Sequence, residues 1–148
     1  MRFKDIREFI TFLEGKGELR RITTPVSCEL EITEIADRLT KRGGPALLFE
    51  NVVGYDIPVL INTYSSIQRT AWALGVETLD DLADRIRKLL GIVQGPPKGI
   101  MDKLRTLGDL MKMASFQPKT VRSAPCQEVV LTGDQVDLTR FPILKCWP

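Results

Sequence analysis

The stretch of sequence that decides the fold is Gly43-Gly44-Pro45-Ala46-Leu47-Leu48-Phe49-Glu50-Asn51. After its Gly-Gly-Pro break, residues 46–50 form a compact apolar run, and a second such run, Pro58–Asn62, follows a turn at residues 54–57. Continuous apolar runs are typical of strands whose sheet is covered on both faces, as in α/β folds. The sequence therefore predicts an α/β domain around a small mixed sheet.

Helical periods lie on both sides of these two strands. Apolar residues at three- and four-residue steps predict helices over Asp5–Gly15, Leu30–Arg42, Ser65 or Ser66 to Leu74, Thr78–Leu90 and 100–115. A further strand is predicted over Leu19–Thr24, and a breaker-rich loop over residues 91–99. The second helix should bury one apolar face and expose acid-first pairs on the other: Leu30, Ile35, Ala36 and Leu39 inside, Glu34–Arg38 and Asp37–Lys41 outside.

The pattern changes after Phe116. Prolines then separate short β-like runs, notably Glu128–Leu131, with a turn at Thr132–Asp134 and a short helical turn at Asp137–Arg140. We place a domain boundary here: 1–116 is a helix-rich N-terminal α/β domain, and 117–148 is a connector with the first strands of a β-type, split-barrel-like central domain. The last eight residues contain one charge, Lys145. Natural termini are usually polar and frayed, so we expect a truncated chain whose native form continues.

Composition narrows the classes of function. Of the 148 residues, 43% are hydrophobic and 27% are charged, which is ordinary for a soluble globular protein. The 21 basic and 19 acidic residues leave a net charge of +2, which is too balanced for a nucleic-acid-binding surface. No apolar run approaches the roughly 20 residues of a membrane helix, and the N-terminus has no apolar signal core. We therefore expect a cytoplasmic protein with neither an integral membrane segment nor a nucleic-acid partner.

Histidine is absent, and the three cysteines, Cys28, Cys126 and Cys146, lie far apart. The first fact excludes Ser-His and Cys-His dyads and His-ligated metals within these residues. The second predicts free thiols, buried or partly buried, in place of a disulfide framework or a zinc ribbon.

The remaining candidates for chemistry have simpler interpretations. Gly15-Lys16-Gly17 and Arg42-Gly43-Gly44 match no phosphate-loop pattern and sit where helices should end, which indicates C-caps. The carboxylates of Glu34, Asp37, Asp80, Asp81 and Asp84 are typical of solvated faces and helix starts. Arg20 and Arg21 flank a strand, and Arg69 is expected in a surface packing contact with Trp72. We therefore predict no catalytic, cofactor-binding or metal-ligating residue.

Several stretches, in order along the chain, resemble one enzyme family. They are Lys4–Phe9 with Gly17–Ile22, Leu30–Arg38, Gly43–Asn51 with Gly54-Tyr55 and Pro58–Leu60, then Ala124–Gln127, Asp137-Leu138 and Phe141–Pro148. Together they are similar to the N-terminal domain of UbiD-type decarboxylases, which depend on prenylated FMN and include 3-polyprenyl-4-hydroxybenzoate decarboxylase. The last pieces resemble the passage into the family's central domain.

The resemblance implies a carboxy-lyase that reversibly decarboxylates an aromatic acid, such as 3-polyprenyl-4-hydroxybenzoate in ubiquinone biosynthesis. It implies prenylated FMN as cofactor, together with Mn²⁺ or Mg²⁺ and K⁺. A flavin prenyltransferase would supply the prenylated FMN, and the full-length protein would be a homo-oligomer. The flavin is the electron sink of such a reaction. A polyprenylated substrate would place the enzyme peripherally at the membrane. The family's metal ligands and catalytic Arg and carboxylates lie beyond the Cys-Trp-Pro segment, so these 148 residues are expected to bind no cofactor and to be inactive alone.

Two other hypotheses remain beside the enzyme fragment. The chain could be a stand-alone, non-catalytic interaction or scaffold module derived from that domain. It could also be an independent flavin- or nucleotide-binding protein, which the lack of a phosphate loop disfavours. The sequence leaves open which aromatic acid is the substrate, which oligomer forms and whether the truncation is natural.

Overall fold

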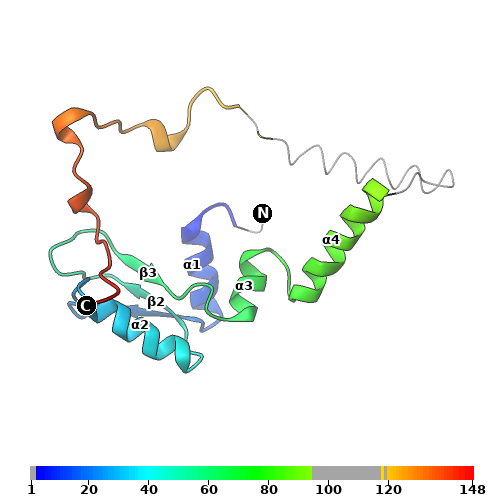
Figure 1. Cartoon of the computed structure of the whole chain (residues 1–148), viewed down its shortest axis with the longest axis horizontal. Helices are drawn as coiled ribbons and strands as arrows, with labels where there is room; N and C mark the ends of the chain where they lie inside the picture. The colour runs from blue at the N-terminus through cyan, green and yellow to red at the C-terminus, as the bar shows by residue number, and fades with distance from the viewer. Residues whose placement is uncertain (1–2, 95–117, 119) are drawn as a thin grey trace. The chain divides into compact units, whose positions relative to one another are not determined.

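The computed structural model of the chain describes residues 3–94, 118 and 120–148. Its elements are α1 (Ile6–Gly15), β1 (Leu19–Ile22), α2 (Glu31–Lys41), β2 (Ala46–Phe49), β3 (Val59–Ile61), α3 (Ile67–Ala73), α4 (Leu79–Gln94), η1 (Pro125–Gln127), η2 (Gly133–Gln135) and η3 (Leu138–Arg140) (Figure 1). The chain forms two compact units, Met1–Leu79 with Asp137–Pro148, and Asp80–Val136. The predicted helix 100–115, most of the predicted loop before it and the predicted boundary after residue 116 lie outside the described residues.

The sheet has three strands in the order β1-β2-β3. β1 runs parallel to β2, with Leu19 opposite Ala46, and β3 runs antiparallel to β2, with Val59 opposite Phe49. A parallel pair needs a crossover connection, and α2 lies in the one between β1 and β2. The predicted α/β class and the small mixed sheet are confirmed.

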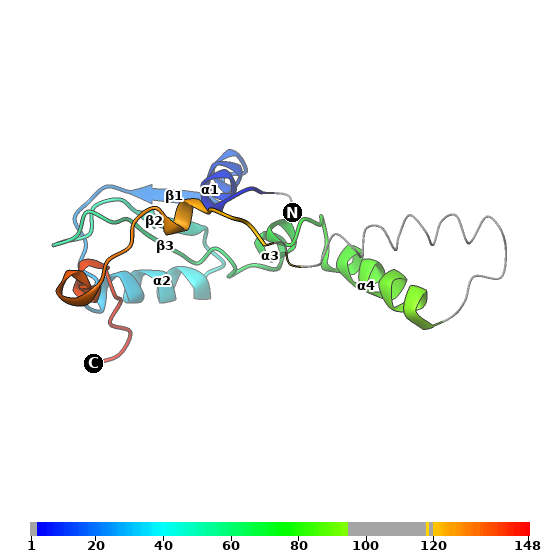
Figure 2. The same ribbon diagram turned by 90° about the horizontal axis from the view of Figure 1, so that it is seen from above.

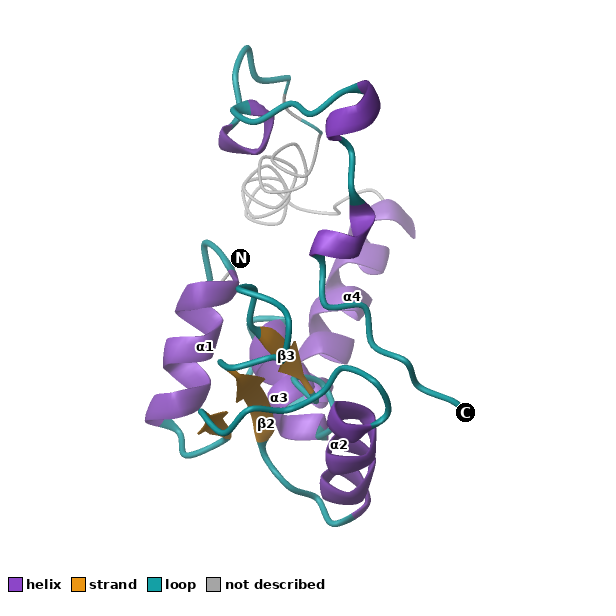
Figure 3. Cartoon of the chain, turned by 90° about the vertical axis from the view of Figure 1, so that its left-hand side faces the viewer, coloured by secondary structure: helices purple, strands orange, loops and turns teal. Residues whose placement is uncertain are grey.

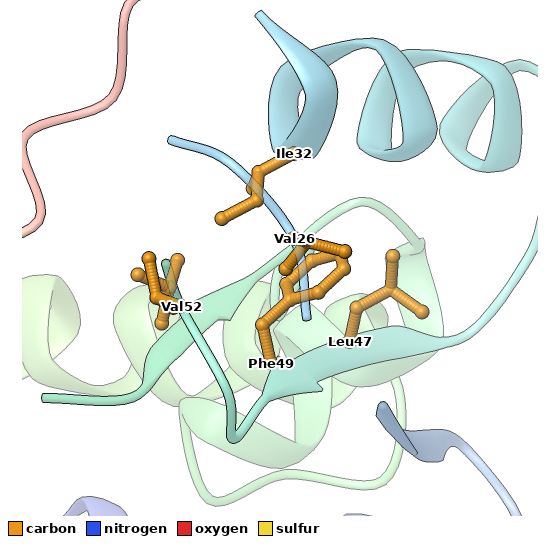
Figure 4. Packing of buried hydrophobic residues seen from close by; sticks show 6 residues of the cluster. Val26, Ile32, Leu47, Phe49 and Val52 are labelled. Carbon is orange, nitrogen blue, oxygen red and sulfur yellow. The ribbon is translucent and has the colours of Figure 1, made fainter. Parts of the chain in front are cut away.

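β2 is buried at all four positions because helices cover both faces of the sheet. Figures 2 and 3 show α1 on one side of the strands and α2 on the other. Successive strand side chains point to opposite faces, so β2 supplies both cores. Leu47 and Phe49 join the cluster beneath α2 (Figure 4), with Val26, Ile32, Val52 and Val59. Ala46 and Leu48 join the cluster beneath α1, with Phe9, Leu13 and Leu19.

Helix ends follow the local signals in the sequence. The Asp5 carboxylate caps α1 by accepting from the backbone N–H groups of Arg7 and Glu8 at 2.9 and 3.0 Å. Three helices are closed by a glycine with positive φ: Gly17 at 72°, Gly43 at 68° and Gly75 at 76°. In each case the next backbone N–H donates to a carbonyl in the last helical turn, the arrangement of a Schellman cap. The interpretation of both Gly-basic clusters as C-caps is confirmed.

Gly44 is needed for a different reason, namely space. A Cβ at this position would lie 2.9 Å from Leu39 Cδ2 and 3.1 Å from the Leu39 carbonyl oxygen. Gly15, which is helical, has nothing within 4 Å of such an atom. A side chain at position 44 would therefore push against Leu39, so glycine favours this close turn from α2 into β2.

Two predicted helix boundaries are wrong. Leu30 was expected in the core face of α2, but it is the N-cap residue, has φ 65° and is 37% exposed. The helix begins after Leu30, and Ile32 and Ala36, four residues apart on one face, are its buried residues. Ile32 is fully buried and takes the place in the core that was expected for Leu30. α4 was expected to end at Leu90, yet it continues through Gly91 to Gln94. A single glycine in a helix costs only about 1 kcal/mol relative to alanine, so it does not terminate α4.

The C-terminal residues differ most from expectation. Glu128–Leu131, predicted as a β-like run, is no strand, and Val129 and Val130 are 76% and 71% exposed. An extended segment becomes a strand only where a partner accepts its backbone hydrogen bonds. Among residues 120–148, the β pairing is a single parallel bridge from Lys145 to Glu29. The short helical turn at Asp137–Arg140 is confirmed as η3, which Asp137 caps by accepting from Thr139 N–H at 2.9 Å.

Within the described ranges, no helix is long and apolar enough to cross a membrane.

Candidate functional site

Arg69 is the buried charge of the N-terminal unit, with 1% of its surface exposed. Ser66 caps α3 by accepting from the backbone N–H of Arg69 at 3.1 Å, which fixes the start of the helix. The Arg69 guanidinium then donates to three segments of the chain. Its acceptors are the Glu18 carboxylate, the Gly44 carbonyl at 3.0 Å and the Ser65 hydroxyl at 2.6 Å. One buried cation thus joins the residue before β1, the end of α2 and the start of α3.

The expected surface contact between Arg69 and Trp72 is wrong. Trp72 instead packs against Phe12 of α1, with ring centroids 5.3 Å apart in an edge-to-face arrangement, and Lys16 Nζ lies 5.8 Å from the Trp72 centroid. Glu18 is 51 residues from Arg69 in sequence, so no local spacing signals their contact. A basic residue three positions before an aromatic one does not reveal on which side of its helix the core will form.

The Arg69 cluster is suited to holding the fold together rather than to binding a substrate. Both terminal nitrogens already donate, and Nε is buried without a hydrogen-bond partner among the residues that the structure describes. A guanidinium with 1% exposure cannot reach a ligand in solvent. Arg21, which lies within β1, has a similar linking role at the surface, where it pairs with Glu14 at 2.7 Å and Glu50 at 2.6 Å.

The last eight residues, Phe141–Pro148, form what we call the C-terminal strap, which is fastened to the start of α2. Lys145 donates its backbone N–H to the Cys28 carbonyl at 3.0 Å. The Lys145 carbonyl accepts from the Leu30 N–H at 3.2 Å and from the Thr33 hydroxyl at 3.2 Å. Leu144 packs against the core cluster beneath α2. Leu30 has a positive φ, which the sequence does not predict, and it is the residue whose N–H donates to the strap.

The strap and α2 enclose a surface groove of about 580 Å³. It is lined by Leu30, Thr33, Glu34, Asp37, Lys41, Cys146, Trp147 and Pro148. Glu34 and Asp37 are paired with Arg38 and Lys41, each at 2.6 Å, as predicted for a solvated face. Trp147 is 82% exposed. A groove with paired charges and an exposed indole suits the packing of polypeptide better than the binding of a phosphate.

The cysteines are free, as predicted, but the predicted burial is correct only for Cys28. Cys28 is half-buried, whereas Cys126 and Cys146 are exposed. The electrostatic interaction with the neighbouring Cys28 raises the pKa of the Tyr55 phenol, and burial and a hydrogen bond between the two groups add to this. Cys146 lies in the strap beside the groove, where its thiol approaches Thr33 Oγ1 at 4.0 Å.

The described residues do not fit the flavin and metals that the resemblance implies. No group of three or more Cys, Asp or Glu side chains gathers as a metal site in the part of the chain that the structure describes. The carboxylates beside the groove are exposed and already neutralised by basic partners. No step of a reaction is derived from these residues, and the absence of catalytic, cofactor and metal residues stays a prediction.

Comparison with known proteins assigns the strap and its partners in α2 to two domains of one family. Residues 10–89 match the family described as 3-octaprenyl-4-hydroxybenzoate carboxy-lyase N-terminal domain, and residues 119–148 match its Rift-related domain. The strap is thus part of the second match, while its hydrogen-bond partners in α2 are part of the first. The described structure therefore shows a direct contact between residues of the two family domains.

Solved structures point to the same family. The closed form of vanillic acid decarboxylase from Sedimentibacter hydroxybenzoicus matches 89% of this chain with a TM-score of 0.59 and 27% identity. An evolved dimeric form of the UbiD-class enzyme HmfF from Pelotomaculum thermopropionicum, in complex with prFMN, matches 64% with a TM-score of 0.50 and 32% identity. The chain spans only 25% and 21% of those two proteins. Since the first family match alone covers more than half of its residues, the chain belongs to the UbiD family of carboxy-lyases.

Proposed function

We propose that this chain is the part of a UbiD-type carboxy-lyase that anchors the start of the Rift-related domain. The observation that supports this is the strap, whose Lys145 backbone makes hydrogen bonds on both sides to the start of α2. Its Leu144 side chain is at the same time part of the N-terminal core. Whatever follows Pro148 in a longer protein would therefore leave the N-terminal unit from a fixed point and in a fixed direction.

The reaction that this anchoring serves is the decarboxylation of an aromatic acid, with 3-polyprenyl-4-hydroxybenzoate of ubiquinone biosynthesis as one candidate substrate. Support comes from relatives: one is a vanillic acid decarboxylase, and another was determined in complex with prFMN. Prenylated FMN, with Mn²⁺ or Mg²⁺ and K⁺, supplies the electron sink for such a reaction. In this proposal residues 1–116 are the N-terminal domain and 117–148 the beginning of the split-barrel-like central domain. The catalytic and metal-ligating residues belong to the rest of that domain, and full-length protein is a homo-oligomer.

A chimera tests the proposal directly. The corresponding first part of the Sedimentibacter vanillic acid decarboxylase would be replaced by residues 1–148, and vanillic acid decarboxylation measured with the cofactor loaded. We expect an active chimera, since the grafted residues contribute anchoring and no chemical group. The isolated 148-residue chain should show no decarboxylation and no saturable binding of prenylated FMN with Mn²⁺.

Matched variants of the chimera separate anchoring from general damage. Thr33→Val removes one hydrogen bond to the strap, whereas Thr40→Val lies on the exposed side of the same helix. Together with Leu144→Ala, Thr33→Val should lower kcat/KM and flavin occupancy, while Thr40→Val should leave both unchanged. Decarboxylation or cofactor binding by the isolated chain would refute the proposal, and so would a strap-weakened chimera with unchanged kcat/KM and occupancy.

A further inference from the structure

α2 begins in a rare backbone turn. Leu30, the residue before its first turn, has φ 65° and ψ −30°. The Glu31 N–H donates to the Glu29 carbonyl at 2.8 Å, so one hydrogen bond closes a tight turn around Leu30. This is a γ-turn of positive φ, which is rare and strained for a residue with a side chain. Such strain persists only where the surrounding structure holds the backbone in place.

The strap holds the chain in this turn by taking a carbonyl away from α2. In a regular helix the Ile32 N–H would donate to the carbonyl four residues earlier, which is that of Cys28. Here the Cys28 carbonyl accepts from the Lys145 N–H at 3.0 Å, and Ile32 donates one residue further back, to Ser27, at 3.2 Å. The Lys145 carbonyl in turn accepts from the Leu30 N–H at 3.2 Å. The strap therefore occupies an acceptor that the first turn of a longer α2 would use.

The residues before α2 already contain the cap of that longer helix. The Ser27 hydroxyl accepts from the Glu29 N–H at 3.0 Å, which is the bond that an N-cap side chain makes to the second residue of a helix. Leu30, the present N-cap residue, makes no side-chain cap bond. A helix that began at Cys28 would therefore be capped by Ser27, and it would have Glu29 in its first turn, where the macrodipole favours an acid.

We propose that Leu30 is the switch of a releasable strap, because attachment of the strap and extension of α2 back to Ser27 are alternative uses of the Cys28 carbonyl. When the strap leaves, the Ile32 N–H recovers the Cys28 carbonyl and Leu30 relaxes to a helical φ. The Cys28 carbonyl is then satisfied within the helix, so the strap detaches without leaving an unpaired acceptor in the N-terminal unit. The inference rests on the proposed anchoring function and adds that the anchor is reversible.

Release of the strap is tested in the whole chain with two matched double variants. Both carry Leu144→Ala, and both lose the exposed pair of Lys145 with Glu29, whose atoms lie 3.5 Å apart. One carries Lys145→Pro, which has no N–H to donate, and the other Lys145→Ala, which keeps it. Backbone ¹⁵N relaxation of residues 146–147 reports whether the strap is free, and ¹³Cα chemical shifts of residues 28–31 report the turn.

The proline variant should have a mobile strap and Cα shifts that move to helical values, whereas the alanine variant should keep the shifts of the unchanged chain. A free strap with unchanged shifts at residues 28–31 would overturn the proposal. A strap that stays ordered without the Lys145 N–H would overturn it too, because the Cys28 carbonyl would then not be what the strap competes for.

The strain at Leu30 is tested by comparing Leu30→Gly with Leu30→Ala. Glycine accepts a positive φ and alanine does not, so the Lys145 amide should exchange with solvent about fivefold more slowly in Leu30→Gly. In the released proline chain the order should reverse, with an unfolding constant in urea about fivefold larger for glycine, which is the poorer helix former. Equal exchange, or a released chain as stable with glycine as with alanine, would refute the switch. Neither readout involves the kcat/KM or flavin occupancy of the chimera, so failure of the switch is distinguishable from failure of the anchor.

Discussion

Removing the Glu18 carboxylate should destabilise the fold far more than the loss of an exposed ion pair does. Arg69 is 1% exposed and the Glu18 side chain 40%, so the cost falls on the buried cation. Glu18→Ala leaves a guanidinium without its counter-charge, which in buried pairs costs about 3 to 5 kcal/mol. We expect about 3 kcal/mol, the lower end, because water can reach the partly open carboxylate position.

Removing the other partner, Arg69, should cost less than removing Glu18. In a chain that lacks Arg69, the further loss of the Glu18 carboxylate should have little effect. Arg69→Met keeps much of the volume but leaves the Gly44 carbonyl without its side-chain donor, at a cost of about 2 kcal/mol. The Glu18 carboxylate that remains is hydrated. The double variant should then lose only about 2 kcal/mol in total, which gives a coupling energy of about 3 kcal/mol between the two positions.

Urea unfolding at neutral pH, followed by circular dichroism, measures all four chains of this cycle. The slope of the unfolding free energy with urea should stay constant, since the surface exposed on unfolding is unchanged. Additive single effects, or a loss below about 1 kcal/mol for Glu18→Ala, would contradict the reasoning. Either result would mean that the pair behaves as a surface salt bridge.

Three further predictions concern other parts of the N-terminal unit. Gly44→Ala should lower the unfolding free energy by about 1 to 3 kcal/mol through overlap with the preceding helical turn, whereas Gly15→Ala should be neutral or stabilising, as the same urea assay would show. The hydrogen bond that Glu14 accepts from Arg21 lowers the pKa of the Glu14 carboxyl. The stability that this pair contributes is therefore complete above pH 4.5, the value without the pair, and is lost as the pH falls through the lowered pKa. Carboxyl NMR titration should show the Glu14 pKa returning toward 4.5 in Arg21→Met. Thr33→Val should cost about 1 kcal/mol and speed amide exchange in the strap, and unchanged exchange would contradict the assigned contact.

Local features of the sequence were sufficient for most helix ends. Asp5 as a cap and the three closing glycines act through bonds within one turn, so a short stretch of sequence contains the whole interaction. The ion pairs Glu34–Arg38 and Asp37–Lys41 were predictable for the same reason. In α4, Asp84 pairs with Arg87 three residues on, and not with Lys88 at the i,i+4 position. Exposed side chains of this kind choose between neighbours that differ little in energy.

The candidate site was largely beyond sequence reasoning. The Arg69 cluster and the strap both depend on residues brought together by the completed sheet: Glu18 is 51 residues from Arg69, and Lys145 is 116 residues from Glu29. The run Glu128–Leu131 failed as a strand because β propensity requires a partner edge. One indication of the strap was present in the sequence, namely its unusually apolar composition, with Lys145 as its one charge. From this composition we expected that further structure covers these residues.

By itself, the sequence determined the α/β class, the two-sided burial of β2, the caps and the family, since each depends on periodicity, local bonding or an ordered set of motifs. Only the tertiary structure decided that Arg69 is buried, that Leu30 leaves the core to donate to the strap, and that Lys145 of the strap bonds to the start of α2. These outcomes depend on which distant backbone and side-chain groups remain unsatisfied once the sheet has formed. Such groups are satisfied by whatever the folded chain places beside them, however far away in sequence it lies.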